Sequence, residues 1–315
     1  MEWLQLAIGF GVLLFAGDLL VRGAVHTSLR LGVPAFIVSL TIVAIGTSAP
    51  EMLISVSAVL DGAPGLAVGN VVGSNIANVL LVLGLPALFS VLKTSETDTR
   101  FSYYQLLFAT ALFTIFALSG SIDLISGVVL LLAFGIGIAL SVNQAMVARN
   151  VRRAGEMEET VPGEELHMPW WRILVLLLVG LAGLPFGADL LVDSASTIAR
   201  TFNVSETVIG LTVVAVGTSL PELATSVAAA LRKQADVALG NVIGSCIANI
   251  LAIIGVAGLF GSVPIGQDIL GFDLWVMVGT TVLLAPFVFR PIDIDRIWGI
   301  LFVGAYVVYV SVVLF

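Results

Sequence analysis

The fold of this chain is decided by a stretch at residues 44–58, AIGTSAPEMLISVSA, which recurs at residues 215–229 as AVGTSLPELATSVAA. The two copies agree at nine of fifteen positions. Each sets a carboxylate, Glu51 or Glu222, directly after a proline inside a long apolar tract. A charge in such a tract needs an explanation, and the recurrence indicates that it is not accidental.

A second block recurs with the same spacing. GNVVGSNIANVLLVLG at residues 69–84 agrees with GNVIGSCIANILAIIG at residues 240–255 at ten of sixteen positions. The pentapeptide GDLLV at 17–21 matches ADLLV at 188–192 apart from its first residue. All three alignments have one offset of 171 residues. A single offset across three blocks indicates an internal duplication.

The composition is that of a membrane protein. Of the 315 residues, 59% are hydrophobic and 11% are charged, and the mean hydropathy is +1.12. A soluble domain carries about 25% charged residues, and runs such as LLVLGLPALF lack the period-two alternation of a membrane barrel. Apolar stretches of about 20 residues, each long enough to cross a bilayer as a helix, recur throughout. The sequence predicts an all-α polytopic membrane protein with ten transmembrane helices, at residues 3–21, 35–60, 66–91, 103–120, 123–146, 172–192, 205–231, 237–262, 270–289 and 297–315.

Each half of the duplication contains five spans, an odd number, so the second half enters the membrane from the opposite side. Such inverted-topology repeats are typical of secondary transporters, whose substrate site lies near the membrane midplane. We expect a first five-helix repeat at residues 1–146, a hydrophilic linker at 147–171 and a second five-helix repeat at 172–315. The opening MEWLQLAIGF has no basic n-region, so we do not expect a cleavable signal peptide. The single cysteine, Cys246, excludes an internal disulfide framework.

Basic residues predict the orientation. With ten spans, one side of the membrane collects Arg200 alone, and the other side collects twelve Lys and Arg residues. The positive-inside rule then puts both termini outside and the linker in the cytoplasm of a cell (inner or plasma) membrane. The twelve residues are Arg22, Arg30, Lys93, Arg100, Arg149, Arg152, Arg153, Arg172, Arg232, Lys233, Arg290 and Arg296.

The repeated blocks also hold the dense polar clusters of the spans. Oxygen-bearing side chains occur there four residues apart, so each pair lies on one helix face. Proline bends such helices, and irregular backbone at membrane depth is tolerated where it lines a cavity. Carbonyl, hydroxyl, amide and carboxylate oxygens suit hard cations such as Ca²⁺, and the scarcity of His and Cys argues against zinc, copper or iron. The four pairs are Thr47 with Glu51, Ser74 with Asn78, Thr218 with Glu222, and Ser245 with Asn249.

A carboxylate at the bilayer centre is a functional candidate by default, and no Lys or Arg lies at comparable depth in the spans. We therefore expect Glu51 and Glu222 to bind ions. Other conspicuous residues have structural interpretations. These are helix packing for Ser55, Ser57 and Ser226, close packing for the glycines of GNVVG and GNVIG, interfaces or caps for Asp18 and Asp189, a small packing residue for Cys246, and loops or interfaces for His26 and His167.

The motifs GTSAPE with GNVVGSNIANVLLVLG, and GTSLPE with GNVIGSCIANILAIIG, resemble the two alpha repeats of sodium/calcium exchangers, in the calcium/cation antiporter superfamily. The resemblance covers essentially the whole chain and is to the compact prokaryotic exchangers, which lack a large regulatory loop. It implies antiport of Ca²⁺ against Na⁺ by alternating access, in which the first and sixth helices slide against a rigid remainder. No cofactor is implied.

The resemblance also implies a role for each matching position. The central calcium site would consist of Glu51, Glu222 and the backbone carbonyls of Thr47 and Thr218. One flanking sodium site would consist of Thr47, Ser74, Glu222 and the Ala44 carbonyl, and its inverted twin of Thr218, Ser245, Glu51 and the Ala215 carbonyl. Asn78 and Asn249 would line the middle. Some relatives carry an aspartate in place of Asn249, so this pocket holds two carboxylates, which match one Ca²⁺ without excess.

Two alternatives remain open. A proton-coupled cation exchanger of the same superfamily would have this fold, although its repeats resemble GNxxE in place of GTSxPE. A channel or an intramembrane hydrolase is more remote, because no His or Cys–His arrangement lies inside the spans. We expect an antiporter rather than an enzyme. Its partners would be Ca²⁺, Na⁺ and the lipid bilayer, without nucleic acid, and a monomer would suffice for transport.

Overall fold

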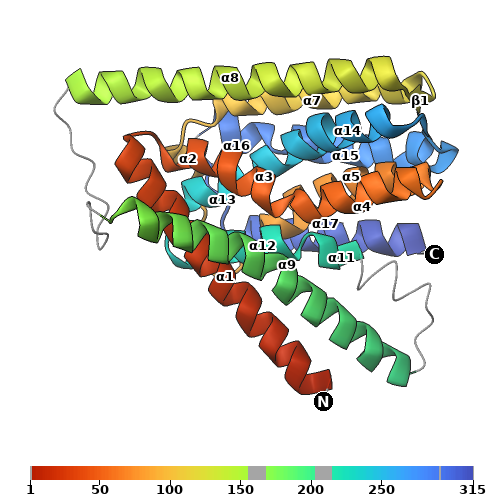
Figure 1. Cartoon of the computed structure of the whole chain (residues 1–315), viewed down its shortest axis with the longest axis horizontal. Coiled ribbons are helices and arrows are strands. Elements are labelled where there is room, and N and C mark those ends of the chain that lie inside the picture. The colour runs from red at the N-terminus through yellow and green to blue at the C-terminus, as the bar shows by residue number, and fades with distance from the viewer. Residues whose placement is uncertain (1, 155–167, 203–214, 291, 315) are drawn as a thin grey trace.

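The chain is almost entirely helical (Figure 1), and the computed structural model describes residues 2–154, 168–202, 215–290 and 292–314. Short 3₁₀ (η3) and π-helical (η1, η2, η5, η6) segments interrupt the α-helices. The first half consists of α1 (Glu2–Leu31), α2 (Ala35–Val38), η1 (Ser39–Val43), α3 (Ala44–Thr47), α4 (Ala49–Leu60), α5 (Pro64–Ala77), η2 (Asn78–Val82), α6 (Gly84–Ala87), η3 (Thr94–Glu96), α7 (Arg100–Leu118), β1 (Ser121–Ile122) and α8 (Leu124–Ala154). The second half consists of α9 (Trp170–Thr201), α11 (Ala215–Thr218), α12 (Leu220–Leu231), α13 (Ala235–Ile247), η5 (Ala248–Ile253), α14 (Ile254–Phe260), β2 (Val263–Pro264), η6 (Ile269–Asp273), α15 (Leu274–Leu283), α16 (Ala285–Phe289) and α17 (Arg296–Leu314).

Each of the ten expected spans contains helix. Eight helical segments of the described residues are long and apolar enough to cross a membrane, and a ninth span bends by 43° between Ala35–Thr47 and Ala49–Leu60. The expected span 205–231 is represented by α11 and α12, and its beginning at 205–214 lies outside the described residues. The prediction of a polytopic all-α membrane protein is therefore confirmed.

Three helices are longer than their apolar cores predicted. α1 continues to Leu31 in place of residue 21, α8 continues to Ala154 in place of residue 146, and α9 spans Trp170–Thr201 in place of 172–192. The hydropathy pattern locates the apolar core of a span and not the helix ends, which continue into polar sequence. The extension corrects one further expectation, because His26 is buried within α1 and does not lie in a loop. His167 lies outside the described residues.

The duplication is visible in the backbone. The offset of 171 residues carries α3 and α4 onto the bounds of α11 and α12 without any adjustment. It also carries the break residue Ser48, at φ −83° and ψ 6°, onto Ser219, at φ −88° and ψ 5°. Gly62 at φ 77°, in the turn after α4, corresponds to Lys233 at φ 58° after α12. The left-handed backbone is the same in both turns, although lysine adopts it less readily than glycine.

The loops pair at opposite ends of the bundle, as inverted repeats require. At one end, β1 pairs antiparallel with β2, with Ile122 opposite Val263. At the other end, Leu92 and Ile294 form an antiparallel bridge, near where α8 ends and α9 begins (Figure 1). By the offset, Leu92 corresponds to Val263. The structure therefore consists of two five-helix repeats of opposite orientation in the membrane.

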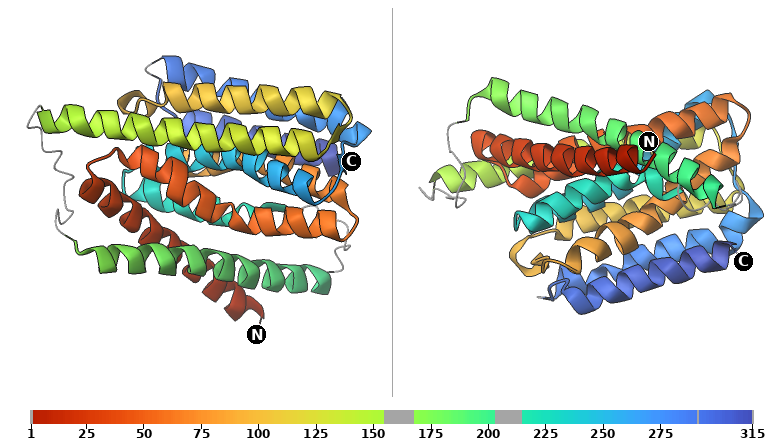
Figure 2. Two further views of the ribbon diagram at one scale, coloured as in Figure 1. Left: turned by 45° about the horizontal axis from the view of Figure 1, so that its top comes forward. Right: turned by 90° about the horizontal axis from the view of Figure 1, so that it is seen from below.

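α1 and α9 form a closely packed antiparallel pair at one edge of the molecule, across from α15 and α17 (Figure 2). Glycines permit this close approach. A Cβ atom added to Gly9 would lie 2.8 Å from the backbone N of Leu191, and one added to Gly187 would lie 2.9 Å from that of Leu13. These backbones touch, so α1 and α9 make a single structural unit.

Candidate cation-binding site

Each repeat places its GTSxPE motif at a helix break. Ser48 separates α3 from α4, and Ser219 separates α11 from α12. Pro50 and Pro221 are the second residues of the helices that follow. A missing backbone N–H costs nothing there, because first-turn N–H groups have no helical partner. The prolines permit the interruption, as predicted, but the break itself lies two residues earlier, at the serines.

The breaks put both carboxylates into the first turn of a helix. Glu51 is the third residue of α4, and Glu222 is the third residue of α12. The positive end of the helix dipole stabilises a nearby anion by about 0.3–1 kcal/mol. Burying a carboxylate costs several kcal/mol even after relaxation. The dipole therefore explains why an acid is tolerated at this turn, but it does not neutralise the charge.

The serine at each break is not used as an ordinary helix cap. Ser48 and Ser219 stand three residues before a glutamate, which is the spacing of a capping box. Neither side chain makes a capping hydrogen bond. Ser48 Oγ donates to Glu222 Oε1 of the other repeat at 3.1 Å, and Ser219 Oγ is buried with no partner among the described residues. Ser48 thus links the two motifs through the acid.

An asparagine of the second motif holds each break in place. Asn70 Nδ2 donates to the backbone carbonyl of Glu51 at 3.2 Å and to Ser55 Oγ at 3.0 Å. Asn241 makes the two repeat-related bonds in the second half, both at 3.3 Å. Each glutamate is therefore fixed through its own backbone, and its side chain remains free for another partner.

Asn241 also connects the repeats. Its Oδ1 accepts a hydrogen bond from Thr47 Oγ1 at 3.2 Å. Thr47, in turn, also donates at 3.3 Å to the carbonyl of Ala44. Neither Asn70 nor Asn241 was expected to act at the site, since their motif was interpreted as close packing. Their recurrence in GNVVG and GNVIG was the signal that could have identified them.

The two carboxylates are buried without a counter-charge. Glu51 is 1% exposed and Glu222 is 0% exposed, and they lie close enough to repel each other. Among the described residues, no Lys or Arg belongs to the buried polar set. Two like charges with no partner are far more costly than a neutralised pair. Their proximity is physically reasonable only if a cation lies between them.

Unpartnered polar atoms accompany the carboxylates. Native proteins satisfy more than about 90% of their buried polar groups. In the part of the chain that the structure describes, eight buried side-chain atoms lack a hydrogen-bond partner, and seven of them belong to the repeated motifs. Carboxylate, hydroxyl and amide oxygens dominate this set, and they are the ligands that Ca²⁺ takes. The seven are Glu51 Oε2, Asn78 Nδ2, Asn78 Oδ1, Ser219 Oγ, Glu222 Oε2, Ser245 Oγ and Asn249 Oδ1.

The residues expected at the site are almost all buried at the helix breaks. Thr218 is half-buried at the end of α11, and Ala215 is the first residue of that helix. Thr47 and Ser245 lie beside the carboxylate of Glu222. Ser48 and Ser219 join the set as oxygen donors that the sequence interpretation left out. The buried members are Ala44, Thr47, Glu51, Ser74, Asn78, Glu222, Ser245 and Asn249.

The structural interpretations can be checked against the same contacts. The glycines of GNVIG do serve close packing, because a Cβ atom added to Gly240 would lie 2.5 Å from the carbonyl of Phe36. Ser226 accepts its hydrogen bond from Asn241. Cys246 is a buried free cysteine. These expectations are confirmed.

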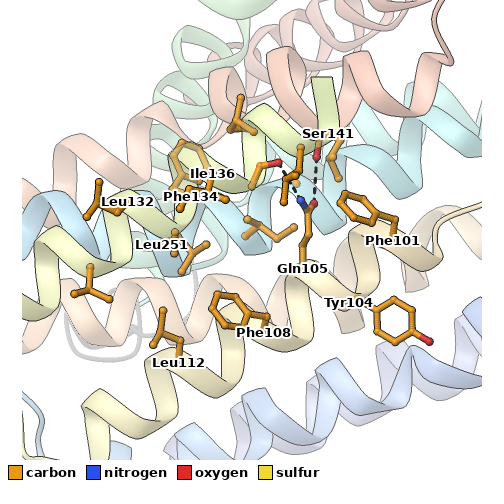
Figure 3. A pocket seen from close by; sticks show the side chains of 18 residues that line it. Phe101, Tyr104, Gln105, Phe108, Leu112, Leu132, Phe134, Ile136, Ser141 and Leu251 are labelled. Carbon is orange, nitrogen blue, oxygen red and sulfur yellow. Dashed lines mark hydrogen bonds between the residues drawn. The ribbon is translucent and has the colours of Figure 1, made fainter. Parts of the chain in front are cut away.

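A groove of about 500 Å³ opens between α7 and α8, away from the acid pair (Figure 3). Its walls are apolar apart from Gln105, whose Nε2 donates to the carbonyl of Gly137 at 2.9 Å. Ser141 Oγ donates to Gln105 Oε1 at 3.2 Å. The polar groups of the groove therefore satisfy one another, and it offers no set of free oxygens for a cation.

Comparisons with known proteins agree with this geometry. The chain matches the family described as sodium/calcium exchanger protein over residues 1–143 and 172–315. It is 34% identical to the sodium/calcium exchanger MaX1 of Methanosarcina acetivorans, over 100% of this chain and 99% of that protein. It is 31% identical to the inner membrane protein YrbG of Escherichia coli, over 97% and 94%. A solved structure of the sodium-calcium exchanger NCX_Mj, soaked with Na⁺ and Sr²⁺, superposes with a TM-score of 0.83 at 34% identity, over 98% of this chain and 97% of that one.

Inverted repeats that enclose a buried acid pair define the class of membrane-embedded ion antiporters. The match of the family across both repeats, together with full-length relatives, makes the assignment specific. The chain belongs to the sodium/calcium exchanger family, as the resemblance of its motifs predicted, and it is a multi-pass calcium-exchange antiporter.

Proposed function

We propose that this protein exchanges Ca²⁺ for Na⁺ by alternating access, with both ions bound at one site between the two repeats. One observation carries the proposal: two buried carboxylates, one from each repeat, lie together among unpartnered oxygens with no basic side chain in the buried polar set of the described residues. The printed names of MaX1 and NCX_Mj, both sodium/calcium exchangers, support sodium as the coupling ion.

The site is assigned as follows. Glu51 and Glu222, with the backbone carbonyls of Thr47 and Thr218, hold Ca²⁺ at the centre. Na⁺ occupies two flanking positions, related by the repeat. Asn78 and Asn249 line the middle. The flanking ligands are Ala44, Thr47, Ser74 and Glu222 on one side, and Ala215, Thr218, Ser245 and Glu51 on the other.

Exchange follows from shared ligands. Ca²⁺ and Na⁺ both require the two glutamates, and two negative charges balance one Ca²⁺. Binding of Na⁺ at the flanking positions takes oxygens from Ca²⁺, and binding of Ca²⁺ does the reverse. The two ions therefore cannot be bound together with full coordination, which is the condition for antiport.

We propose that α1 and α9 slide as one unit to alternate access, since they pack tightly on each other and lie at the edge of the bundle (Figure 2). α1 also packs on α12, where a Cβ atom added to Gly17 would lie 2.8 Å from the carbonyl of Ala224. An ion pair between Asp18 Oδ1 and Arg232 Nε at 2.5 Å joins the same two helices. The repeat-related residues, Asp189 and Asp61, are both acids, so the mirrored position of the unit has no such pair.

Asp18→Asn should therefore shift exchange modestly. Partly exposed ion pairs contribute about 0.2–1 kcal/mol, so we expect a change of about two- to fivefold in the Ca²⁺ concentration that half-saturates uptake. Arg232→Gln should produce the same shift, and the double variant should add nothing further. Asp189→Asn is the matched control and should leave the value unchanged. Additive effects of the two single changes would contradict the coupling.

We further propose that residues 1–146 and 172–315 are the two repeats, joined by a cytoplasmic linker at 147–171, with both termini outside a cell (inner or plasma) membrane. Basic loops support this orientation. Arg30 Nε donates to the carbonyl of Met168 at 3.1 Å, and its guanidinium lies over the ring of Trp170. The basic end of α1 and the start of α9 thus lie on the same side, as the proposed topology requires.

The coupling ion can be tested in proteoliposomes that contain the purified protein. We expect uptake of radioactive calcium when the internal Na⁺ exceeds the external Na⁺, and background uptake under K⁺ or pH gradients of equal size. The uptake should saturate with calcium. Uptake driven by a pH gradient but not by a Na⁺ gradient would overturn sodium coupling and favour a proton-coupled exchanger. Uptake that needs no counter-ion would indicate a channel.

A further inference from the structure

A buried asparagine that the proposed site does not use lies directly behind it. Asn75, on α5, is 2% exposed. Its Nδ2 donates to the backbone carbonyl of Cys246 at 3.4 Å, and its Oδ1 accepts from Nδ2 of Asn249 at 3.2 Å. Asn75 therefore spans the two repeats, from one motif block to the other.

The direction of this chain of hydrogen bonds is fixed at one end. A backbone carbonyl can only accept, so the carbonyl of Cys246 requires the NH₂ group of Asn75. Asn75 then turns its oxygen toward Asn249, which must answer with its own NH₂ group. The oxygen of Asn249 is left facing away from Asn75, and it is buried with no partner among the described residues. The opposite rotamer would present N–H groups, which repel a cation.

The related amide in the first repeat has no such support. By the offset of 171 residues, Asn249 corresponds to Asn78 and Asn75 corresponds to Cys246. A thiol is a weak donor and a weak acceptor, and Cys246 Sγ lies 4.0 Å from the carbonyl of Asn75. In the described structure, both polar atoms of the Asn78 side chain are buried and unpartnered. One amide of the pair is held, and the other is not.

We propose that Asn75 is a positioning residue for calcium, which holds the Asn249 amide with its oxygen toward the bound cation, whereas Asn78 is oriented by the cation itself. The inference rests on the proposed function, in which Asn249 lines the site. An oxygen that is oriented in advance does not have to be turned during binding, which favours affinity. Asn75 acts through Asn249 and does not touch the ion.

Asn75→Cys is the variant of choice, because the second repeat carries cysteine at the equivalent buried position. Without its partner, the Asn249 amide can turn either way. We expect Ca²⁺ to bind the purified protein about tenfold more weakly in calorimetry, in line with the loss of one buried hydrogen bond. Asn75→Ser, whose hydroxyl is too short to reach Asn249, serves as the second variant, with the same expectation if the cysteine variant does not fold.

The deciding comparison uses Asn249→Asp as a second background. Both terminal atoms of a carboxylate are oxygens, so its orientation does not need to be fixed. In that background, Asn75→Cys should change the Ca²⁺ affinity less than about twofold. An equal loss in both backgrounds would assign Asn75 a merely structural role, and no loss in either would also overturn the proposal. Failure of the proposed function is distinguishable, because the unmodified protein would then bind no Ca²⁺ at all.

Discussion

Glu222→Gln should abolish calcium exchange. The substitution keeps the shape of the side chain and removes one of the two charges that face the ion. Loss of one member of a buried charge pair costs about 2–5 kcal/mol, which corresponds to roughly 30- to 3,000-fold in affinity. Uptake of radioactive calcium into proteoliposomes under a Na⁺ gradient should therefore fall to background. Glu51→Gln should have the same effect, because the two acids are equivalent under the repeat.

Stability separates this outcome from misfolding. The two carboxylates are buried and repel each other, so either Glu→Gln change removes an unfavourable interaction when no cation is bound. In buffer without Ca²⁺ and Na⁺, the thermal unfolding midpoint of Glu222→Gln in detergent should be higher than that of the unmodified protein. Asp61→Asn, at an exposed turn, is the control and should transport normally. Substantial calcium uptake by Glu222→Gln would contradict the assignment of the site.

Gly244→Ala should have the second largest effect. A Cβ atom at this position would lie 2.3 Å from the carbonyl of Leu40 and 2.6 Å from Cβ of Ala44. Neither atom can rotate away, so α13 and the segment η1–α3 must separate. Overpacking of this kind costs about 1–3 kcal/mol, and the displaced segment carries Thr47. We expect a lower unfolding midpoint in detergent and at least about tenfold slower calcium uptake.

Gly135→Ala is the matched control for this change. Gly135 lies in α8, and in the described structure no atom lies within 4 Å of the Cβ that would be added. Replacement of a helical glycine by alanine favours the helix by up to about 1 kcal/mol, so the unfolding midpoint should stay the same or rise slightly. Similar losses in Gly244→Ala and Gly135→Ala would show that the close approach at Gly244 does not position the site.

Much of the fold was predictable because the chain is duplicated. The offset of 171 residues locates Ser219 from Ser48 and α12 from α4, and the apolar tracts locate the spans. The buried acids were also predictable, since a membrane tract tolerates a carboxylate only for a reason. The ends of α1, α8 and α9 were not, because these helices continue beyond the apolar core into polar sequence.

The supporting contacts of the site could not be predicted from one repeat at a time. Ser48 stands where a capping serine belongs, yet its hydroxyl donates to Glu222 of the other repeat. Asn241 holds its own helix break and also accepts from Thr47 across the interface. Such contacts depend on how the repeats face each other. The local sequence contains the residues, but only the three-dimensional arrangement selects their partners.

Competition between the two ions for one site is the central claim, and calorimetric titration of Ca²⁺ at a series of Na⁺ concentrations tests it most directly. If Na⁺ and Ca²⁺ share Glu51 and Glu222, the apparent Kd for Ca²⁺ should rise with Na⁺, and more steeply than in proportion, because two flanking sodium positions must empty. K⁺ at the same ionic strength should not reproduce the rise. An apparent Kd for Ca²⁺ that does not depend on Na⁺ would contradict a shared site.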